Sequence, residues 1–528
     1  MKSGRWHWAG AGAAAGAVAI GVGEITAALL GGTSIIAAVG TLVIALQPPG
    51  GKDLAVQLFG TNDKLALEIG AALGGILVGA LLGVFSRKDV RIGVIGFVAF
   101  GAFAFYLLQS DPLSGMVPAL ASAAAATGAG SVMLTWLTTS LRRPAATGTA
   151  AVATSAMGEA QLAATPRPSI DRRGFLALSA MFVAVGGVLA FIGRYLTSQV
   201  PAVVADPSSI PAARQTVAPV AGATDFGVEG LTPIVVPNDD FYRIDTRLDV
   251  PRVDAATWSL RVHGLVDREV TLTYEQLLAM PLVERYVTIA CVSNPVGGRL
   301  VGNAKWTGVP LTTVLEQAGV KPEASQLVGR SFDGWTAGFP TEHLRGAGSE
   351  ALIAVAMNGV PLPPAHGFPA RLVVPGLYGY VSATKWITEI ELTTLESFDA
   401  YWVPLGWSKI GPILTQSRVE LPRAGQQLAA GPVQFAGVAW APTRGINKVE
   451  VIVDPTPEGA GTWHQAELSQ PLSSTTWVQW RVTLDVPTGE HRIAVRATDG
   501  TGETQTSDIT PPPPDGARGY HQVTFSAR

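Results

Sequence analysis

The first 200 residues differ from the rest of the chain in how apolar residues are distributed. Up to about residue 200, long runs rich in Ala, Gly, Leu and Val are separated by short charged clusters. A helix needs roughly 20 apolar residues to span a bilayer. We therefore predict an α-helical membrane anchor of about five spans, at residues 9–30, 65–85, 92–108, 116–139 and 175–196. A shorter apolar stretch at 33–47 ends at Pro48-Pro49 and predicts a re-entrant or interfacial helix.

Basic residues flank the predicted spans on one side. With five crossings, one side carries the residues Lys2, Arg5, Arg87, Lys88, Arg91, Arg142, Arg143, Arg172 and Arg173. Cytoplasmic loops carry the excess of Lys and Arg in membrane proteins. The pattern predicts a multi-pass protein of the cell membrane with a cytoplasmic N-terminus, so that everything after residue 196 is extracytoplasmic. Glu24 lies inside the first span, where its role, functional or structural, stays open.

Two further modules follow a Pro/Ala/Val-rich stretch at 201–230, which predicts an extended linker. Residues 231–405 mix strand-like runs, such as 258–264 and 385–392, with short helices. One helix begins at Thr273 with the Thr and Gln spacing of a capping box, and another ends at Gly319. This module is predicted to be α+β.

From residue 411 to 528 apolar and polar positions alternate throughout. Val449, Val451 and Val453 alternate with Lys448 and Glu450, and similar runs follow, each closed by Gly, Pro or Asp. Short strands at regular spacing are typical of an immunoglobulin-like β-sandwich. The chain is therefore predicted to be multi-domain, with residues 1–200, 231–405 and 411–528 as its domains.

Composition narrows the function. The formal net charge is −3 and no stripe of Lys or Arg appears after residue 200, so we expect no nucleic-acid partner. Cys291 is the only cysteine, which excludes an internal disulfide and a site built from cysteines alone. Three roles remain open for it: a buried small side chain, a nucleophile, or a thiolate ligand of a metal cofactor that brings its other ligands. The polar, Gly-rich loop after Cys291 favours the third.

Six short motifs in the second module occur together in a characteristic order. They are 238–243 (NDDFYR), 289–291 (IAC), 302–308 (GNAKWTG), 356–363 (AMNGVPLP), 366–376 (HGFPARLVVPG) and 382–386 (SATKW). In this order they resemble the molybdopterin domain of the sulfite oxidase family, in its membrane-anchored bacterial form of actinobacterial type. The 411–528 module is similar to the dimerisation-type domain that accompanies it.

The resemblance implies a cofactor and its contacts. The family's cofactor is molybdenum held by the dithiolene of a molybdopterin in the mononucleotide form, with one cysteine thiolate as protein ligand, here Cys291. The terminal phosphate of the pterin requires cationic and N–H donors. The implied cofactor-binding residues are Asn238, Asp239, Phe241, Arg243, Asn303, His366, Arg371, Ser382, Thr384 and Lys385.

The sequence departs from the family near the expected substrate. Where sulfite oxidases have an Asn-Arg-Arg segment, this chain has Asn294-Pro295-Val296. Trp335 stands where the family's active-site tyrosine is expected, and Phe339 follows on the same run. We expect Cys291, Trp335 and Phe339 at the reacting centre. A site for a small dianion should concentrate positive charge, and this segment has lost arginine. An oxyanion such as sulfite is therefore a possible but not a favoured substrate. The alternative is a neutral S- or N-oxide of the methionine sulfoxide type.

Partners follow from the same interpretation. The expected function is extracytoplasmic oxygen-atom transfer, with electrons exchanged with a separate cytochrome or quinone-linked protein, because the chain has no Cys-x-x-Cys-His motif. The bilayer is a further partner and a homodimer is possible. The competing hypothesis from another class is a non-catalytic envelope scaffold with a vestigial cofactor fold.

Overall fold

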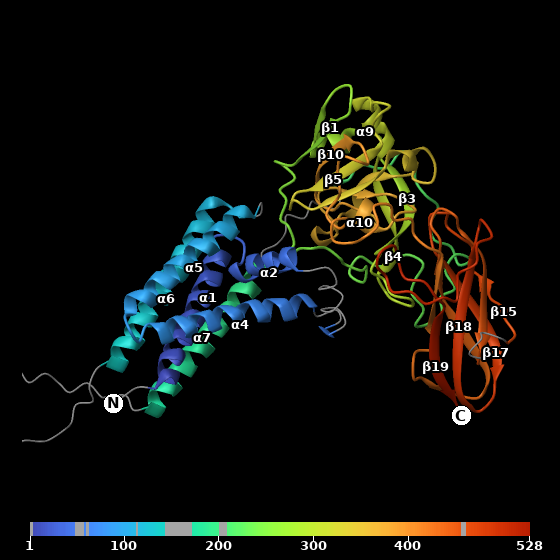
Figure 1. Cartoon of the computed structure of the whole chain (residues 1–528). Coiled ribbons are helices and arrows are strands. Elements are labelled where there is room, and N and C mark those ends of the chain that lie inside the picture. Colours follow the sequence, from blue (N-terminus) through green and yellow to red (C-terminus); the bar gives the residue numbers. More distant parts are fainter. Residues whose placement is uncertain are drawn as a thin grey trace, which may run out of the picture. The chain divides into compact units, whose positions relative to one another are not determined.

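The computed structural model describes residues 4–47, 58–59, 63–111, 114–142, 172–199, 209–455 and 461–528, and the chain divides into two compact units (Figure 1). The first, here called the helical unit, comprises Met1–Pro201 together with Thr246–Asp249. The second, here called the β-rich unit, comprises Ala202–Asp245 and Val250–Arg528. Residues 201–208 of the predicted linker lie outside the described residues.

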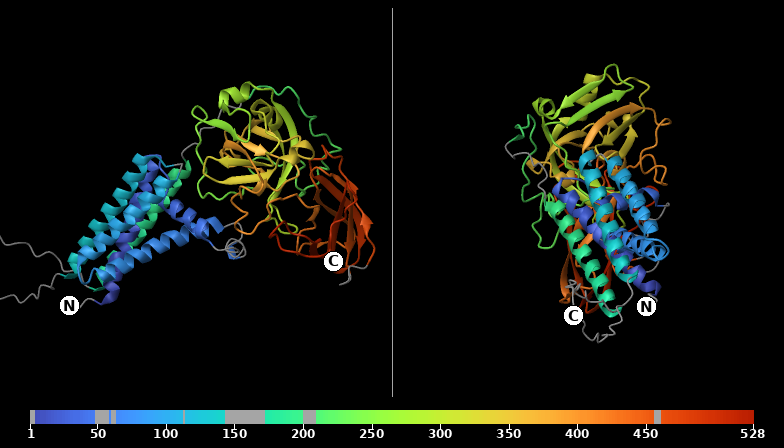
Figure 2. Two further views of the ribbon diagram at one scale, coloured as in Figure 1. Left: turned by 45° about the horizontal axis from the view of Figure 1, so that its top comes forward. Right: turned by 90° about the vertical axis from the view of Figure 1, so that its left-hand side faces the viewer.

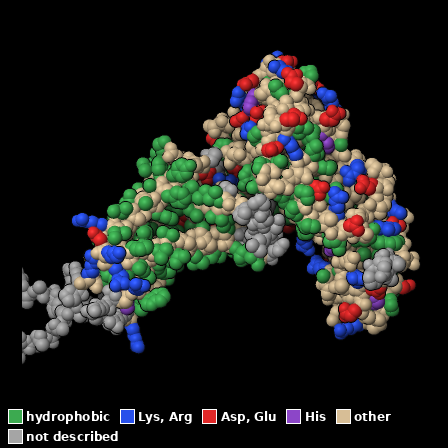
Figure 3. All heavy atoms as spheres, viewed as in Figure 1, with side chains coloured by type: hydrophobic (Ala, Val, Ile, Leu, Met, Phe, Trp, Pro, Cys, Tyr) green, Lys and Arg blue, Asp and Glu red, His purple; other side chains and the backbone are tan. Residues whose placement is uncertain are grey.

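The described part of the helical unit consists of helices and the short loops between them. The helices are α1 (Arg5–Leu29), α2 (Ile35–Leu46), α4 (Asp63–Phe85), α5 (Val90–Ser110), α6 (Met116–Arg142) and α7 (Arg172–Gln199). Five of the described helices, all except α2, are long and apolar enough to cross a membrane. They overlap the five predicted spans, and apolar side chains cover much of the face that Figure 3 shows.

Helix α1 is the centre of this unit. It packs against α4, α6 and α7. Figure 2 shows the helices of this unit, coloured blue to green, from two further sides. Glycines permit the closest approach: a Cβ at Gly12 would lie 2.1 Å from the carbonyl oxygen of Gly79, and one at Gly79 would lie 2.6 Å from that of Gly12. Small residues allow helix backbones to come this close in lipid, where packing contacts drive association. The Gly-rich sequence of the first span thus determines its central place.

The β-rich unit begins with two five-stranded sheets. One has the order β2-β1-β10-β5-β6, and the other has the order β3-β4-β7-β8 with β9 paired to β7. Their strands are β1 (Ser259–Gly264), β2 (Val270–Thr273), β3 (Val283–Ala290), β4 (Val301–Pro310), β5 (Gln326–Ser331), β6 (Thr336–Pro340), β7 (Leu352–Met357), β8 (Val360–Pro361), β9 (Arg371–Val373) and β10 (Ile387–Thr393). Short helices connect them: α8 (Tyr274–Ala279), α9 (Leu311–Ala318) and α10 (Gly379–Ser382), with 3₁₀ turns Thr341–Arg345 and Pro364–His366.

The end signals read from the sequence are present. Thr273 and Gln276 form both hydrogen bonds of a capping box at the start of α8. Helix α9 ends at Gly319, whose φ of 70° is the left-handed conformation that glycine adopts readily. Both helices and the strands around 259–264 and 387–393 are therefore confirmed. Trp306 and Trp386 are fully buried in the shared core of the two sheets.

Residues after 411 form two more sheets around a second core. The sheets have the orders β11-β13-β17-β16 and β12-β19-β18-β14-β15, and Phe435, Trp480 and Phe525 fill the core. The strands are β11 (Gln416–Leu421), β12 (Gln427–Leu428), β13 (Gly431–Trp440), β14 (Ile446–Val453), β15 (His464–Gln465), β16 (Glu467–Leu468), β17 (Val478–Val486), β18 (Gly489–Asp499) and β19 (His521–Ala527). The alternation in the sequence predicted these strands, and the immunoglobulin-like assignment stays a prediction.

The described part of the predicted linker follows the β-rich unit closely. Gln215 pairs with Val283 at the start of β3, and the backbone N–H of Phe226 donates to Gln479 on β17 (2.7 Å). These two bonds attach residues 215–226 to β3 and to β17.

Candidate functional site

Cys291 stands at the end of a buried strand, where the chain leaves β3 for the loop to β4. It is 8% exposed, and its backbone N–H donates to the carbonyl of Leu300 across the base of the loop (2.9 Å). Its Sγ lies 2.9 Å from the hydroxyl oxygen of Ser293. The strand-to-loop transition therefore presents one thiol at the edge of the sheet, with the Gly-rich loop beside it.

Two tyrosines that the sequence analysis did not select lie close enough to Cys291 to interact with it electrostatically. Burial raises the pKa of Tyr242, and the nearby Cys291 raises it further. Burial also raises the pKa of Tyr378 to about 12, against the effect of its bond to the Leu414 N–H, and Cys291 again contributes. Both phenols therefore stay protonated at neutral pH and keep a hydroxyl that can donate a hydrogen bond.

Three cationic side chains gather at the ends of neighbouring elements. Arg371 begins β9, Lys385 precedes β10, and Arg243 comes from the segment before the first strand. The Lys385 Nζ and the Arg243 Nε both donate to the carboxylate of Asp245, each at 2.8 Å. Arg371 donates to the backbone carbonyls of Leu372, His366 and Ala383, at 3.2–3.4 Å.

This cluster carries more positive than negative charge. Burial lowers the pKa of Arg371 to about 10, and it lowers that of Lys385 to about 8, where Asp245 opposes the shift and Arg371 and Arg243 add to it. Arg243 and Lys385 thus share one carboxylate, while Arg371, a third cation close enough to lower the pKa of Lys385, bonds to backbone carbonyls. Buried charges require partners, so the cluster is suited to an anion.

His366 closes the cluster on one side. Its Nε2 lies 3.0 Å from the backbone carbonyl of Asn238, to which a neutral ring donates. Burial lowers the pKa of His366 to about 4, and the neighbouring cations lower it further, while the carbonyl of Asn238 raises it. Phe241 packs edge-to-face against the His366 ring and against Trp306, with centroids 5.7 and 5.9 Å apart. The 238–243 motif thereby forms the aromatic wall of the site.

Other predicted site residues have protein partners. The Asn303 side chain accepts from Thr288 and donates to the Ile234 carbonyl, both bonds in the core, and its role in binding a cofactor stays a prediction. The hydroxyls of Ser382 and Thr384 donate to backbone carbonyls, of Tyr378 (3.0 Å) and Gly329 (3.4 Å). Asp239 is exposed.

The two predicted aromatic residues of the reacting centre lie on the β5–β6 hairpin. Trp335 is half-buried in the turn, where its backbone bonds to Ser331 and Asp333. Phe339 is buried on β6 and packs edge-to-face against His343, whose ring bonds to the Pro375 carbonyl. These contacts belong to the hairpin and core, and the role of either residue at the reacting centre stays a prediction.

The last residues before β19 also reach this site. A Cβ at Gly516 would lie 2.7 Å from the Tyr378 hydroxyl, and the pKa of Tyr378 responds to Asp515 and Arg518. Arg418 on β11 donates to the Gly298 carbonyl in the loop that follows Cys291 (2.6 Å). Local sequence patterns could not indicate these contacts, because they join positions more than 100 residues apart.

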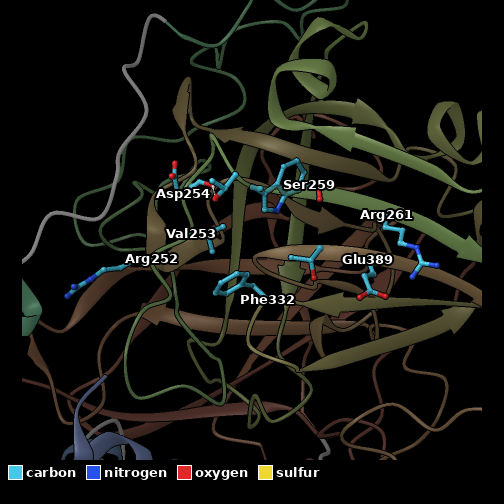
Figure 4. A pocket seen from close by; sticks show the side chains of 10 residues that line it. Arg252, Val253, Asp254, Ser259, Arg261, Phe332 and Glu389 are labelled. Carbon is cyan, nitrogen blue, oxygen red and sulfur yellow. Dashed lines mark hydrogen bonds between the residues drawn. The ribbon is translucent and has the colours of Figure 1, made fainter. Parts of the chain in front are cut away.

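A separate pocket of about 470 Å³ lies beside the starts of β1 and β10 (Figure 4). Its lining includes Arg252, Asp254, Arg261, Phe332 and Glu389, and none of the predicted site residues. Arg261 is paired with Glu269, and Glu389 with His263. Both of these charged side chains that line the pocket therefore have partners within the protein.

Cys291 and the cluster of Arg243, Arg371 and Lys385 fit the cofactor that the sequence motifs imply. No group of three or more His, Cys, Asp or Glu side chains that could hold a metal occurs among the described residues. A metal bound at Cys291 would thus depend on ligands carried by a cofactor. The cationic surplus of Arg243, Arg371 and Lys385 suits a terminal phosphate.

Comparisons with known proteins point the same way. The family model described as "Oxidoreductase molybdopterin binding domain" matches residues 247–402. The uncharacterized oxidoreductase YuiH of Bacillus subtilis (strain 168) is 38% identical over 164 residues, which are 31% of this chain and 79% of the relative. Human mitochondrial sulfite oxidase is 28% identical over 326 residues, and the match covers 52% of this chain but only 58% of that protein.

Among solved structures, the sulfane dehydrogenase SoxCD from Paracoccus pantotrophus is similar, with 23% identity and a TM-score of 0.45, covering 53% of this chain and 76% of that chain. The motifs, the molybdopterin-domain match and the sequence relatives agree with one another. The chain belongs to the sulfite oxidase family of molybdopterin-dependent oxidoreductases.

Proposed function

We propose that the protein is a membrane-anchored oxidoreductase whose molybdopterin is bound through Cys291. When bound, the cofactor supplies oxygen-atom transfer at molybdenum. The observation that carries the proposal is that Tyr242 interacts electrostatically both with the one thiol, at the end of β3, and with Arg371 of a cluster of three cations and one carboxylate. Cys291 would hold the metal, while Arg371, Lys385 and Arg243 would bind the phosphate.

The remaining residues have supporting roles in this proposal. His366 is neutral and donates to the 238–243 segment, so it orders the aromatic wall formed by Phe241. Asp245 keeps Lys385 charged and directed into the cluster. Tyr242 and Tyr378, protonated at neutral pH, would donate to a substrate oxygen near the metal. Trp335 and Phe339 would shape access from the hairpin.

For the substrate, the structure favours a neutral S- or N-oxide over sulfite. Residues 292–298, directly after Cys291, contain no arginine, and Arg299, which follows them, is exposed. The phenols of Tyr242 and Tyr378, whose pKa values are raised by burial, are uncharged donors at neutral pH. Neutral donors suit a neutral oxide, whereas a dianion requires concentrated positive charge.

We further propose that the five long apolar helices cross the cell membrane and that the catalytic part lies on the extracytoplasmic side. The support is the position of the basic residues, which flank these helices on one side. Electrons would pass to or from a separate cytochrome or quinone-linked partner. The module after residue 411 would be immunoglobulin-like.

The test compares two assays on one purified sample of the full chain. We expect reduction of methionine sulfoxide with reduced viologen as electron donor, and little sulfite-driven dye reduction. The opposite ranking would assign the protein to sulfite oxidation. Metal analysis of the same sample decides the scaffold hypothesis: about one molybdenum per chain excludes it, and none from a host competent in cofactor synthesis overturns our proposal.

A further inference from the structure

The loop that follows Cys291 is closed by bonds within itself. The Cys291 N–H donates to the Leu300 carbonyl (2.9 Å), and the Leu300 N–H donates to the Asn294 side chain (2.8 Å). In the middle of the loop, the Gly298 N–H donates to the Pro295 carbonyl (2.8 Å). These bonds join the ends of the loop and form a turn at its tip. They do not attach that tip to the rest of the β-rich unit.

One attachment of the tip comes from Arg418 on β11, in the module after residue 411. The Arg418 Nη1 donates to the Gly298 carbonyl (2.6 Å), and Arg418 is only 5% exposed. A hydrogen bond from a charged donor is shorter and stronger than one between neutral groups. Arg418 therefore restricts where the Gly298 carbonyl lies relative to β11.

Arg418 is itself held by Glu420. The two residues lie two positions apart on β11, so their side chains can share a face of the strand. They form a buried ion pair, in which the Arg418 Nε lies 2.9 Å from the Glu420 Oε1. Glu420 also accepts from the backbone N–H and the hydroxyl of Thr232 (2.7 and 2.6 Å). The carboxylate thus has partners on both sides and fixes the guanidinium against the loop.

A second contact on the tip comes from His521, at the start of β19. Its Nδ1 accepts from the Val419 N–H (3.0 Å), which orients the ring. A Cβ added at Gly297 would collide with this ring, so the ring packs directly on the backbone of the glycine. Gly297 has a φ of 74°, the left-handed conformation that glycine adopts readily. Two strands of the module after residue 411 thus contact two adjacent residues of the loop.

We propose that Arg418, held by Glu420 and assisted by His521, positions the loop after Cys291 so that the thiol keeps the place needed to ligate the metal. Arg418 is a positioning residue in this arrangement, because it acts on the thiol through the loop. The role of the thiol as a ligand rests on the proposed function, whereas the attachment of the loop does not. The module after residue 411 then supports the metal site from outside the molybdopterin domain.

The experiment uses the full chain, in which Cys291 is the only cysteine. Labelling of the cofactor-free protein with N-ethylmaleimide, followed by mass spectrometry, therefore reports on this one thiol. Cys291 is 8% exposed, so labelling requires a local opening of the structure around it. Arg418→Met keeps an unbranched side chain but removes the donors to the loop. It should speed labelling at least about fivefold.

A double variant separates positioning from general damage. Arg418→Met alone leaves the Glu420 carboxylate buried without its cation, which should lower the melting temperature. Adding Glu420→Gln removes that unpaired charge and should raise the melting temperature again, while labelling stays fast because the bond to Gly298 is still absent. Arg492→Met is the matched control, since Arg492 lies on β18 of the same module and also donates to a backbone carbonyl, that of Pro455 (3.0 Å). It should leave the labelling rate unchanged.

The second readout is molybdenum retention in protein from a host competent in cofactor synthesis. The double variant Arg418→Met with Glu420→Gln should lose bound molybdenum at least about threefold faster than wild type, because the loop no longer holds the ligand in place. Gly297→Ala, whose Cβ would meet the His521 ring, should change both readouts in the same direction.

The contrary outcomes are distinct. Unchanged labelling in the double variant, or equally fast labelling in Arg492→Met, would show that Arg418 does not hold the loop. Faster labelling with unchanged molybdenum loss would show that the loop does not position the ligand. If the wild-type protein contained no molybdenum, the proposed function would fail, while the labelling rates would still decide whether Arg418 attaches the loop.

Discussion

At the scale of single residues, the site is defined by charges that the protein alone leaves unbalanced. Arg371 is 4% exposed and bonds only to carbonyls through contacts of 3.2–3.4 Å, with the Trp306 ring 5.1 Å from its guanidinium carbon. Lys385 shares its one carboxylate with Arg243. An anionic group in this position would supply the missing partner. Two predictions follow at this scale.

Cofactor binding should weaken as the pH rises through about 8. Burial lowers the pKa of Lys385 to about 8, so the lysine is charged below this pH and neutral above it. An anion binds the charged form better, hence pterin release should accelerate between pH 7 and 9. Lys385→Arg keeps its charge over this range and should flatten the profile. An unchanged slope in Lys385→Arg would remove Lys385 from the phosphate site.

Arg371→Met should separate stability from cofactor binding. In the cofactor-free protein the substitution removes a buried cation without a carboxylate partner, so the free energy of unfolding should stay unchanged or rise by up to about 2 kcal/mol. Pterin content should nevertheless fall at least about tenfold. Chemical denaturation and pterin fluorescence measure the two effects. A marked loss of cofactor-free stability would mean that Arg371 is mainly a structural residue.

At the scale of secondary-structure elements, local signals in the sequence carried much of the prediction. The capping box at Thr273, the glycine end at Gly319 and the apolar runs of the long helices rely on neighbours within a few residues. The contacts of Tyr378 with the residues before β19, and those of Arg247 with Asp111, could not be predicted. They join distant positions, and only the folded sheets and helices bring them together.

The close packing of α1 and α4 gives an element-scale prediction. Gly79→Val would place a Cβ 2.6 Å from a backbone oxygen of Gly12, which cannot move aside without shifting a helix. Overpacking of this kind costs about 1–3 kcal/mol or more, so the melting temperature in detergent should drop clearly. Gly70→Val, on the same helix with no atom within 4 Å, is the control and should melt as wild type. Equal melting of both variants would contradict the helix contact.

Asp499 gives a second element-scale prediction, since it links the end of β18 to Thr415, just before β11, and to Arg444, in the loop between β13 and β14. Its carboxylate accepts from Thr415 (2.8 Å), Arg444 (2.7 Å) and Thr501 (2.7 Å). Burial opposes ionisation, but these bonds outweigh it and hold the pKa of Asp499 well below its usual range. Its contribution to stability is therefore present above about pH 4 and decreases as the pH falls further.

Asp499→Asn should lower the free energy of unfolding at pH 7 by about 2–4 kcal/mol, because it leaves Arg444 without its carboxylate. Denaturant titration followed by tryptophan fluorescence measures this loss. The difference between variant and wild type should shrink at pH 3. A difference that is independent of pH would show that the charge of Asp499 is not what stabilises the sheets.

At the scale of the whole molecule, the chain combines an apolar helical unit with a β-rich unit that carries the family's motifs. The family membership rests on the match of residues 247–402 and on relatives that match part of this chain.

The central claim is that the Cys291 sulfur binds molybdenum. X-ray absorption at the molybdenum edge of the purified full chain measures this most directly, because it counts the sulfur atoms around the metal. The account predicts two sulfurs from the dithiolene and one from Cys291 in the wild type, and the loss of one in Cys291→Ser. The same sulfur count in both proteins, or a wild-type protein without molybdenum, would contradict it.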